Sequence, residues 1–498
     1  MKKSKIAISV IAVLGAAWIG GAWFTGQIAE TEYKRQIELA NQQFRALGSS
    51  DSFNIEFKNK QFERGFFSSQ VEDEMVISLA KEEKQWTIPF STKLYHGPLP
   101  LNQLMRFDFM PVIFSEEGFI TKNESTQPLF DVTKSDKPIR YRASTSYALT
   151  TKGTVDVTGG EVSYSEPSKG NIVWSNANIG FAIDKALSGE YEFSVDELTL
   201  HSSSNAQRDN VSDEDVESKT QLKGVKYKGS IEPTKWTYIQ KGKGTSSIDS
   251  IEISLTGETN KTLSIVEKGV KGITELDVKD DFLNFKSANS IDSLIIDMEG
   301  RDKTDLGKLV YNVELNHLEA NSINALFESF INIFKEGYVG NSVAIGQIVE
   351  SWFTKYGMAI FNNQPQIKFN PISISDNQGK LALDLNVALA KDPKFDLMSG
   401  GLYNQFTDFA VNIELDKATV EAILTKFASE EERTNIKAKI EEMSSEGANN
   451  GIVVNSEKSV TMKLALENGE LKLNGQAVPE EQAKSIIFML LMSAVMQH

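Results

Sequence analysis

The stretch Ser52-Phe53-Asn54-Ile55-Glu56-Phe57 shows the pattern that decides the fold of this chain. Phe53, Ile55 and Phe57 alternate with polar residues, which is the period of a β-strand with one apolar face. The same alternation returns in three later runs: Tyr191/Phe193/Val195, Ile251/Ile253/Leu255 and Leu276/Val278. Residues 50–315 are therefore predicted to form a long series of antiparallel hairpins, with one face buried and the other in water.

Turn signals fall between or beyond these runs. They are the glycine-containing pairs Arg64-Gly65, Gly159-Gly160, Lys241-Gly242 and Asn468-Gly469. Such pairs are typical of the tight connections between antiparallel strands. The polar and acidic stretch from Ser202 to Lys219 is predicted to be a solvated loop.

The first 24 residues differ from the rest in composition. Lys2, Lys3 and Lys5 precede an apolar run from Ile6 to Phe24. At about 1.5 Å per residue this run spans about 28 Å, close to the thickness of a bilayer core. Because basic flanks stay in the cytoplasm, the pattern predicts a single-pass bacterial inner-membrane protein whose C-terminal body is periplasmic. The alternative is a signal peptide cleaved near Gly20-Gly21-Ala22, but the run is longer than a signal-peptide core.

The next segment, residues 26–48, is predicted to be an amphipathic helix. Its apolar stripe has a 4-3-4-3 spacing and consists of Tyr33, Ile37, Ala40, Phe44 and Leu47. Gly48 follows as a helix-ending residue. Two alternatives are open: the stripe packs on its own domain, or it forms a short parallel coiled coil between two anchored protomers.

Helical patterns return near residue 319. Helices are predicted from Ser322 and over Ser342–Phe361, followed by a strand after Asn377-Gln378-Gly379-Lys380. A second helical stretch, Lys417–Met443, precedes another hairpin around Asn468-Gly469. The sequences NQGKLAL and ENGELKL therefore indicate a repeated helix-plus-hairpin unit. The final apolar run, Ile486–Met496, is too short to span a bilayer and is predicted to be a buried terminal helix or a docking surface.

These patterns predict an α+β protein that is predominantly antiparallel β. An N-terminal transmembrane helix precedes an extended hairpin-rich body with helix-plus-hairpin units towards the C-terminus. The predicted segments are a basic tip and anchor (1–25), a juxtamembrane helix (26–48), a β-rich periplasmic region (49–318) and an α+β periplasmic region (319–498).

Several motifs carry a family resemblance. They are Gly26 with the Tyr33 helix, FERGFFSS at Phe62–Ser69, HGPLP at His96–Pro100 and LNGQAVP at Leu473–Pro479. Together they resemble the uncharacterised YdgA/YihF-type family of Gram-negative inner-membrane and periplasmic proteins, over the full length of the chain. The resemblance implies an inner-membrane location and makes self-association an expectation, but it supplies no catalytic residues. In the family the first motif usually opens with Tyr, so Phe62 here lacks a hydroxyl.

The motifs themselves are predicted to be architectural. Arg64-Gly65 fits a hairpin turn, and Pro98 and Pro100 cannot continue a central strand. His96, beside a Gly-Pro turn, is the best isolated candidate for a chemical role.

Charge and composition narrow the classes of function. The net charge is −16 and the chain contains no cysteine. An acidic body is repelled by nucleic-acid phosphates, so no nucleic-acid partner is expected. Without cysteine there is no disulfide, no thiolate metal ligand and no Cys nucleophile.

No catalytic, cofactor-binding or metal-binding residues are assigned from the sequence. None of the four histidines, His96, His201, His317 and His498, lies at helical ligand spacing from another. The acid pairs Asp280-Asp281 and Glu441-Glu442 are expected by chance in an acidic protein. No cofactor is predicted.

Three hypotheses about function remain open. The first is a non-enzymatic envelope protein, held in the bilayer by residues 6–24, that forms a homodimer or binds another envelope component. The second is a lipid- or hydrophobe-binding protein, whose alternating strands curl into an apolar trough, as in AsmA-like proteins. The third is an envelope hydrolase, which needs carboxylates, or a Ser and a base, to converge in a cleft.

Overall fold

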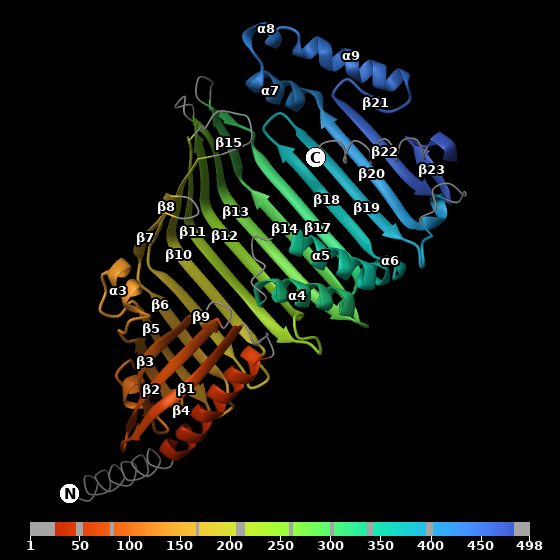
Figure 1. Cartoon of the computed structure of the whole chain (residues 1–498). Helices are drawn as coiled ribbons and strands as arrows, with labels where there is room; N and C mark the ends of the chain where they lie inside the picture. The colour runs from red at the N-terminus through yellow and green to blue at the C-terminus, as the bar shows by residue number, and fades with distance from the viewer. Residues whose placement is uncertain are drawn as a thin grey trace, which may run out of the picture. The chain divides into compact units, whose positions relative to one another are not determined.

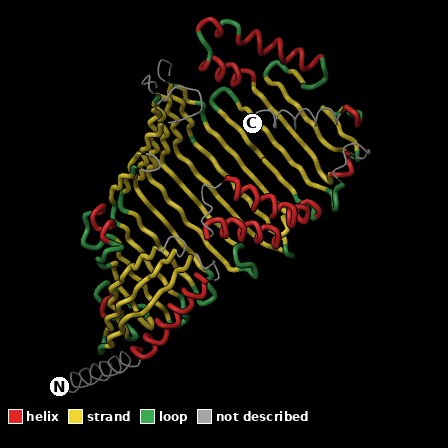
Figure 2. Tube along the Cα trace, in the orientation of Figure 1, coloured by secondary structure: helices red, strands yellow, loops and turns green. Residues whose placement is uncertain are grey.

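The computed structural model describes most of the chain as antiparallel β-sheet with a smaller share of helix (Figures 1 and 2). This confirms the predicted predominance of antiparallel β structure. The chain forms two compact units, each described by itself below. Unit 1 comprises Met1–Leu200, Gly224–Gln240 and Phe327–Gln347, and unit 2 comprises His201–Lys223, Lys241–Leu326 and Ile348–His498. The described residues are 25–45, 53–79, 84–165, 169–205, 215–257, 262–298, 303–335, 342–394 and 402–482.

The strands of unit 1 pair antiparallel in chain order from β1 to β6, and β6 then pairs with β9 and β9 with β10. β7 and β8 form a hairpin, and β8 also pairs with β10. The strands up to β11 are β1 Phe53–Arg64, β2 Ser68–Leu79, β3 Lys84–His96, β4 Val112–Ile120, β5 Ile139–Ser146, β6 Thr151–Val157, β7 Gly160–Tyr164, β8 Lys169–Trp174, β9 Ala177–Ile183, β10 Gly189–Asn205 and β11 Asp215–Pro233. Two short helices, α2 Leu101–Leu104 and α3 Gln127–Thr133, lie in the connections.

The N-terminal helix, residues 25–45, packs on one face of β1–β5. Its residues Ala29 and Tyr33 are buried in a cluster with Val71, Leu94 and Phe114. Further along the helix, the ring of Phe44 lies 5.9 Å from that of Phe57. The predicted apolar stripe therefore packs on the protein's own sheet as far as Phe44. This is the first of the two alternatives given above. Leu47 lies outside the described residues.

The strands of unit 2 also pair antiparallel, largely in chain order. β12, β13, β14, β17, β18, β19, β20, β22 and β23 each pair with the next in this series. β15, β16, β21 and β24 add short edges. The bounds are β12 Gln240–Thr256, β13 Thr262–Lys279, β14 Phe282–Ile291, β15 Ser293–Met298, β16 Thr304–Asp305, β17 Lys308–Glu319, β18 Gln366–Ser375, β19 Lys380–Leu389, β20 Phe406–Asp416, β21 Val454–Asn455, β22 Ser459–Glu467, β23 Glu470–Leu473 and β24 Gln476–Ala477.

The central strands of unit 2 are only half-buried. In β17, β18, β19 and β20 nearly every residue is partly exposed to solvent, and Ala388 is the buried exception. Cross-strand rows of this sheet are nevertheless apolar. One such row runs through Tyr311, Ile372, Leu383, Ile413 and Met462. In an ordinary two-layer core one face of each strand is covered, so alternate residues are buried, and these strands differ from that pattern.

Both predicted helical stretches precede a hairpin. The first contains α4 Ala320–Lys335, α5 Ser342–Trp352, a π-helical turn Phe353–Gly357 and α6 Met358–Asn362, and it leads into β18 and β19. The second contains α7 Lys417–Phe427, α8 Glu430–Arg433 and α9 Ile436–Asn449, and it leads into β22 and β23. The turn at Asn468-Gly469 joins those strands, and both residues have positive φ, as its sequence predicts.

Two local predictions are wrong. Lys241-Gly242 lies inside β12, where Gly242 is paired with Leu276 and Lys241 lies 3.5 Å from Asp277, so cross-strand pairing overrides the turn signal. The predicted loop Ser202–Lys219 is strand at both ends, in β10 and β11. The hydroxyls of Ser202 and Ser218, 2.7 Å apart, show how polar side chains support such a ladder.

Other predictions fall outside the described residues. These are the proposed span at residues 6–24, the middle of the acidic loop (206–214), the terminal run Ile486–Met496 and His498. Among the helices of the described ranges, none has both the length and the apolar character required to span a bilayer.

Candidate functional site

Three of the four segments that carry the family resemblance meet around the N-terminal helix, whereas the fourth, Leu473–Pro479, belongs to unit 2. A Cβ on Gly26 would come within 2.9 Å of the His96 ring, so only glycine fits here without a shift. The His96 amide donates to the Phe67 carbonyl at 3.1 Å, which ties the HGPLP and FERGFFSS segments together. The Tyr33 ring lies 6.1 Å from that of Phe62. His96 is buried where the helix packs on the sheet, which supports the architectural interpretation of these three motifs.

Polar side chains also point to the helix-facing side of this sheet. Register places Glu116 opposite Leu94 and Ala143, which are both buried. Asp73 alternates in β2 with buried Val71, so it projects to the same side. Tyr141 lies across Gly118, where a Cβ would meet the phenol ring at 2.3 Å, and its hydroxyl hydrogen-bonds that of Thr92.

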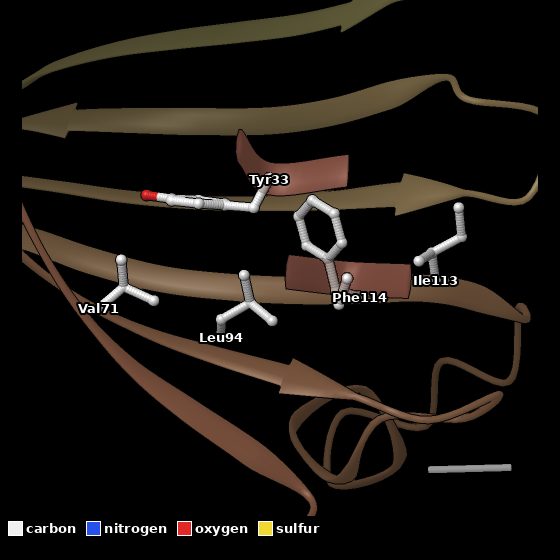
Figure 3. Close-up of a cluster of buried hydrophobic side chains, with 6 residues drawn as sticks. Tyr33, Val71, Leu94, Ile113 and Phe114 are labelled. Atoms are coloured by element: carbon white, nitrogen blue, oxygen red, sulfur yellow. The ribbon is translucent and has the colours of Figure 1, made fainter. Parts of the chain in front are cut away.

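Tyr33 and Asp73 form the fixed part of this polar group. The Tyr33 hydroxyl donates to Asp73 Oδ2, and Asn59 donates to Oδ1 at 2.7 Å. Burial raises the pKa of the Asp73 carboxyl above its ordinary value, although both hydrogen bonds act to lower it. Burial, together with the carboxyls of Glu116 and Asp73, also raises the pKa of Tyr33. Figure 3 shows Tyr33 beside Val71, Leu94 and Phe114, with its hydroxyl pointing away from the Phe114 ring.

Glu116 is the open part of the group. Burial, and secondarily repulsion from Asp73, raises its pKa from an ordinary value of 4.5 to about 7. Within the described parts of the chain, no hydrogen bond or ion pair to the protein is formed by its carboxyl group, and it faces a cavity. A carboxyl group enclosed in this way is ready to pair with a donor that the protein does not supply.

The cavity has a volume of about 500 Å³ and lies between the N-terminal helix and the sheet. This is within the range of about 300–1,000 Å³ that is typical of small-molecule sites. Its walls are mainly apolar, while Asp73, Glu116 and Tyr141 are among its polar lining residues. The apolar lining includes Phe57, Phe90, Leu149, Phe181, Ile183 and Leu187. The arrangement fits a ligand with an apolar body and one hydrogen-bond-donating group.

A second hollow, of about 420 Å³, is also lined by β4 and β5 residues. Two of its charged residues lie near acidic side chains: Arg106 pairs with Glu117, and Arg142 lies 3.8 Å from Asp156. Its walls are more polar than those of the cavity at Glu116, so it is less suited to the apolar body of a ligand.

The residues singled out from the sequence do not join this site. Asp280 and Asp281 both have positive φ and form the turn between β13 and β14. Glu441 pairs with Lys417 at 2.8 Å. His317 stacks on Phe282 at 3.7 Å, and His201 is exposed on β10. A search of the described residues finds no group of three or more His, Asp or Glu side chains suited to a metal ion.

Sequence reasoning missed Asp73, Glu116 and Tyr141. A signal was present for the two acids, because each lies on the face of its strand that otherwise carries apolar residues. Asp73 alternates with Val71 and Met75, and Glu116 alternates with Phe114. Tyr141 carries no such signal, since tyrosine is common on either face of a strand.

Comparison with known proteins identifies the relatives of this chain. An uncharacterized protein of Haemophilus influenzae is 34% identical over 67% of this chain and 88% of its own. Protein YdgA of Escherichia coli is 24% identical over 97% of this chain and 96% of YdgA, and YihF is 21% identical over 97% and 98%. No solved structure matches. A family model matches residues 1–481, and the chain belongs to that family, described as "Bacterial protein of unknown function (DUF945)" and including the predicted relatives YdgA and YihF.

Proposed function

We propose that the protein binds an amphiphile in the cavity beneath its N-terminal helix and does so without catalysing a reaction. The observation that carries this proposal is a largely apolar cavity of about 500 Å³ with Glu116 at its wall. The apolar body of the ligand contacts residues such as Phe90 and Phe181. Its donor group pairs with the Glu116 carboxyl, because Asp73 is already engaged by Tyr33 and Asn59.

The non-catalytic role is supported by the arrangement of the acids. A two-carboxylate hydrolase needs both groups to be available to the substrate. Here Asp73 accepts two hydrogen bonds from the protein, and His96 is enclosed against Gly26. These contacts favour a binding role over an acid–base pair. Self-association stays a prediction.

The placement that we propose is a bacterial inner membrane, with residues 6–24 as the anchor and both units in the periplasm. The support is the apolar run, its basic flank and the closeness in sequence of that run to residues 25–45, the helix that covers the cavity. Such a position gives the cavity direct access to membrane amphiphiles.

Topology is tested by fusing a reporter that is active only in the periplasm to the C-terminus. We expect activity from that fusion and none from a matched reporter that is active only in the cytosol. The opposite result would invert the proposed topology. Release of the full chain by carbonate washing would contradict anchoring itself.

Filling the cavity is expected to displace the ligand. Ala40 lines the cavity from the helix, so Ala40→Phe adds a ring inside it, whereas Gln42→Phe adds the same ring on the exposed side. The full chain is purified in an amphipathic polymer and its bound amphiphiles are measured by mass spectrometry. We expect roughly stoichiometric amphiphile in the wild type and in Gln42→Phe, and at least a tenfold reduction in Ala40→Phe. Equal recovery from all three proteins would refute the cavity as the binding site.

A further inference from the structure

One end of the unit 1 sheet collects the loops next to the start of the N-terminal helix. His96, Phe114, Thr145, Thr151 and Ile183 lie opposite one another in β3, β4, β5, β6 and β9. Gly26 lies against His96 in this row, so the first described turn of the helix is at the same end. Three of the connections at this end are the β1–β2 turn (65–67), the β3–β4 connection (97–111) and the β5–β6 turn (147–150).

These three connections expose large apolar side chains. In the β3–β4 connection Met105, Phe107, Phe109 and Met110 are 63–83% exposed. Phe66 and Tyr147, from the two turns, are 46% and 50% exposed. We call these six residues the apolar rim. Isolated exposed apolar residues are ordinary on a protein surface, but a cluster drawn from separate loops at one end marks an interaction surface.

The β3–β4 connection holds its side chains outward by a defined backbone. The Phe107 amide donates to the Leu104 carbonyl at 3.1 Å, and the Met110 amide donates to Asp108 Oδ1 at 3.0 Å. Phe107 has a φ of +60°, which is unfavourable for a bulky residue and gains nothing here from burial. Strained backbone conformations that no packing of the side chain explains, like that of Phe107, are typical of functional surfaces.

Given the membrane placement proposed above, we propose that the apolar rim inserts into the headgroup region of the bilayer around the anchor. The chain enters unit 1 at this end, directly after the apolar run Ile6–Phe24. Only Thr25 separates that run from Gly26, which leaves the rim little room to stand away from a membrane that the run spans. Phe side chains are found on the apolar faces of interfacial segments, which are buried at the boundary between headgroups and acyl chains, and Tyr is enriched at the membrane interface.

The rim also fits the ligand cavity. The cavity is lined by Leu149 of the β5–β6 turn and by Asp184, Lys185 and Leu187 of the β9–β10 turn at the same end. A rim seated in the headgroups would therefore place these lining residues at the bilayer surface. An amphiphile could then enter the cavity without crossing water.

The lack of native cysteine allows a direct test. Phe107→Cys and, at the opposite end of the sheet, the exposed Glu124→Cys are each labelled with the fluorophore NBD in the full chain. The two proteins are placed in nanodiscs that hold one chain each. We expect blue-shifted NBD emission at position 107 and about threefold more quenching by headgroup-proximal spin-labelled lipids than at position 124. Both substitutions replace exposed side chains, so folding is preserved.

The outcomes separate the rim from the anchor. Equal quenching at 107 and 124, with the chain still embedded in the disc, overturns the rim proposal and leaves the anchor intact. A blue shift without lipid quenching also overturns it, because the rim is then covered by protein. A chain that does not assemble with the disc contradicts the membrane placement itself.

Discussion

Replacing Glu116 with glutamine is expected to raise the free energy of unfolding of unit 1 by about 3 kcal/mol at pH 8. Glu116 has a pKa of about 7 in the folded protein against an ordinary value of 4.5. The folded state therefore holds the proton more tightly than the unfolded state between these values. The stability that the protonated Glu116 carboxyl contributes below pH 4.5 is lost as the pH rises towards 7. The wild-type protein should therefore be least stable above that pH. Glutamine is neutral throughout and avoids this loss.

The measurement is a denaturant series on the full chain, with pulsed hydrogen exchange read from peptides of β1–β5. The Glu116→Gln protein should show a flat stability profile from pH 5 to 8 where the wild type falls. Glu117→Gln is the matched control, since this neighbouring carboxylate points to the opposite face of β4 and pairs with Arg106. A wild-type stability profile that is already flat over this pH range would show that the pKa of Glu116 is not raised in the folded protein. Loss of stability in Glu116→Gln would indicate a hidden partner for the carboxylate.

The elements of this fold were predictable where the local period is strong. The alternation at Ile55 and Phe57, and again at Ile251 and Ile253, places strands correctly because a half-buried sheet imposes its period on the sequence. Asn468-Gly469 identifies its turn because both residues accept positive φ. Local chemistry is sufficient at such positions.

The errors arise where distant pairing overrides local chemistry. Gly242 has the local signal of a turn residue, but its partner Leu276 lies 34 positions further along the chain and keeps it in a ladder. The polar residues around Ser202 have the composition of a loop because they lack an apolar face, yet a facing serine supports the strand. Neither partner can be chosen without knowing the register of the sheet.

The candidate site was less predictable than the fold because it depends on several strands at once. The alternation of Asp73 and Glu116 with apolar neighbours along their strands could have shown that each acid faces inward. They come close to Tyr33 only if the helix packs on that face of the sheet. The apolar stripe of the helix does not show this, because it fits packing on its own domain as well as a coiled coil. Gly118 adds a further condition, since only a missing side chain lets Tyr141 cross β4. Sequence therefore gives the direction of single side chains, and the pairing of strands gives the site.

Tyr33→Ala is expected to destabilise unit 1 by about 3–5 kcal/mol, an effect at least as large as that of Glu116→Gln and opposite in sign. The ring is buried among Val71, Leu94 and Phe114, and its removal leaves a cavity in the seat of the helix. It also removes the hydroxyl that donates to Asp73. Tyr147→Ala is the control, because that ring is half-exposed and its loss should change stability by less than about 0.5 kcal/mol.

Tyr33→Phe separates the two contributions of the side chain. It keeps the ring and leaves the Asp73 carboxyl with Asn59 as a donor, so we expect a loss of about 1–3 kcal/mol that is greatest when Asp73 is ionised. Because the Tyr33 hydrogen bond acts to lower the pKa of Asp73, its removal should raise that pKa further and move the loss of stability to higher pH. Equal stability of Tyr33→Phe and wild type at pH 8 would show that the hydroxyl contributes nothing. The site would then depend on the packing of the helix alone, and Asp73 would be free to contact the ligand beside Glu116.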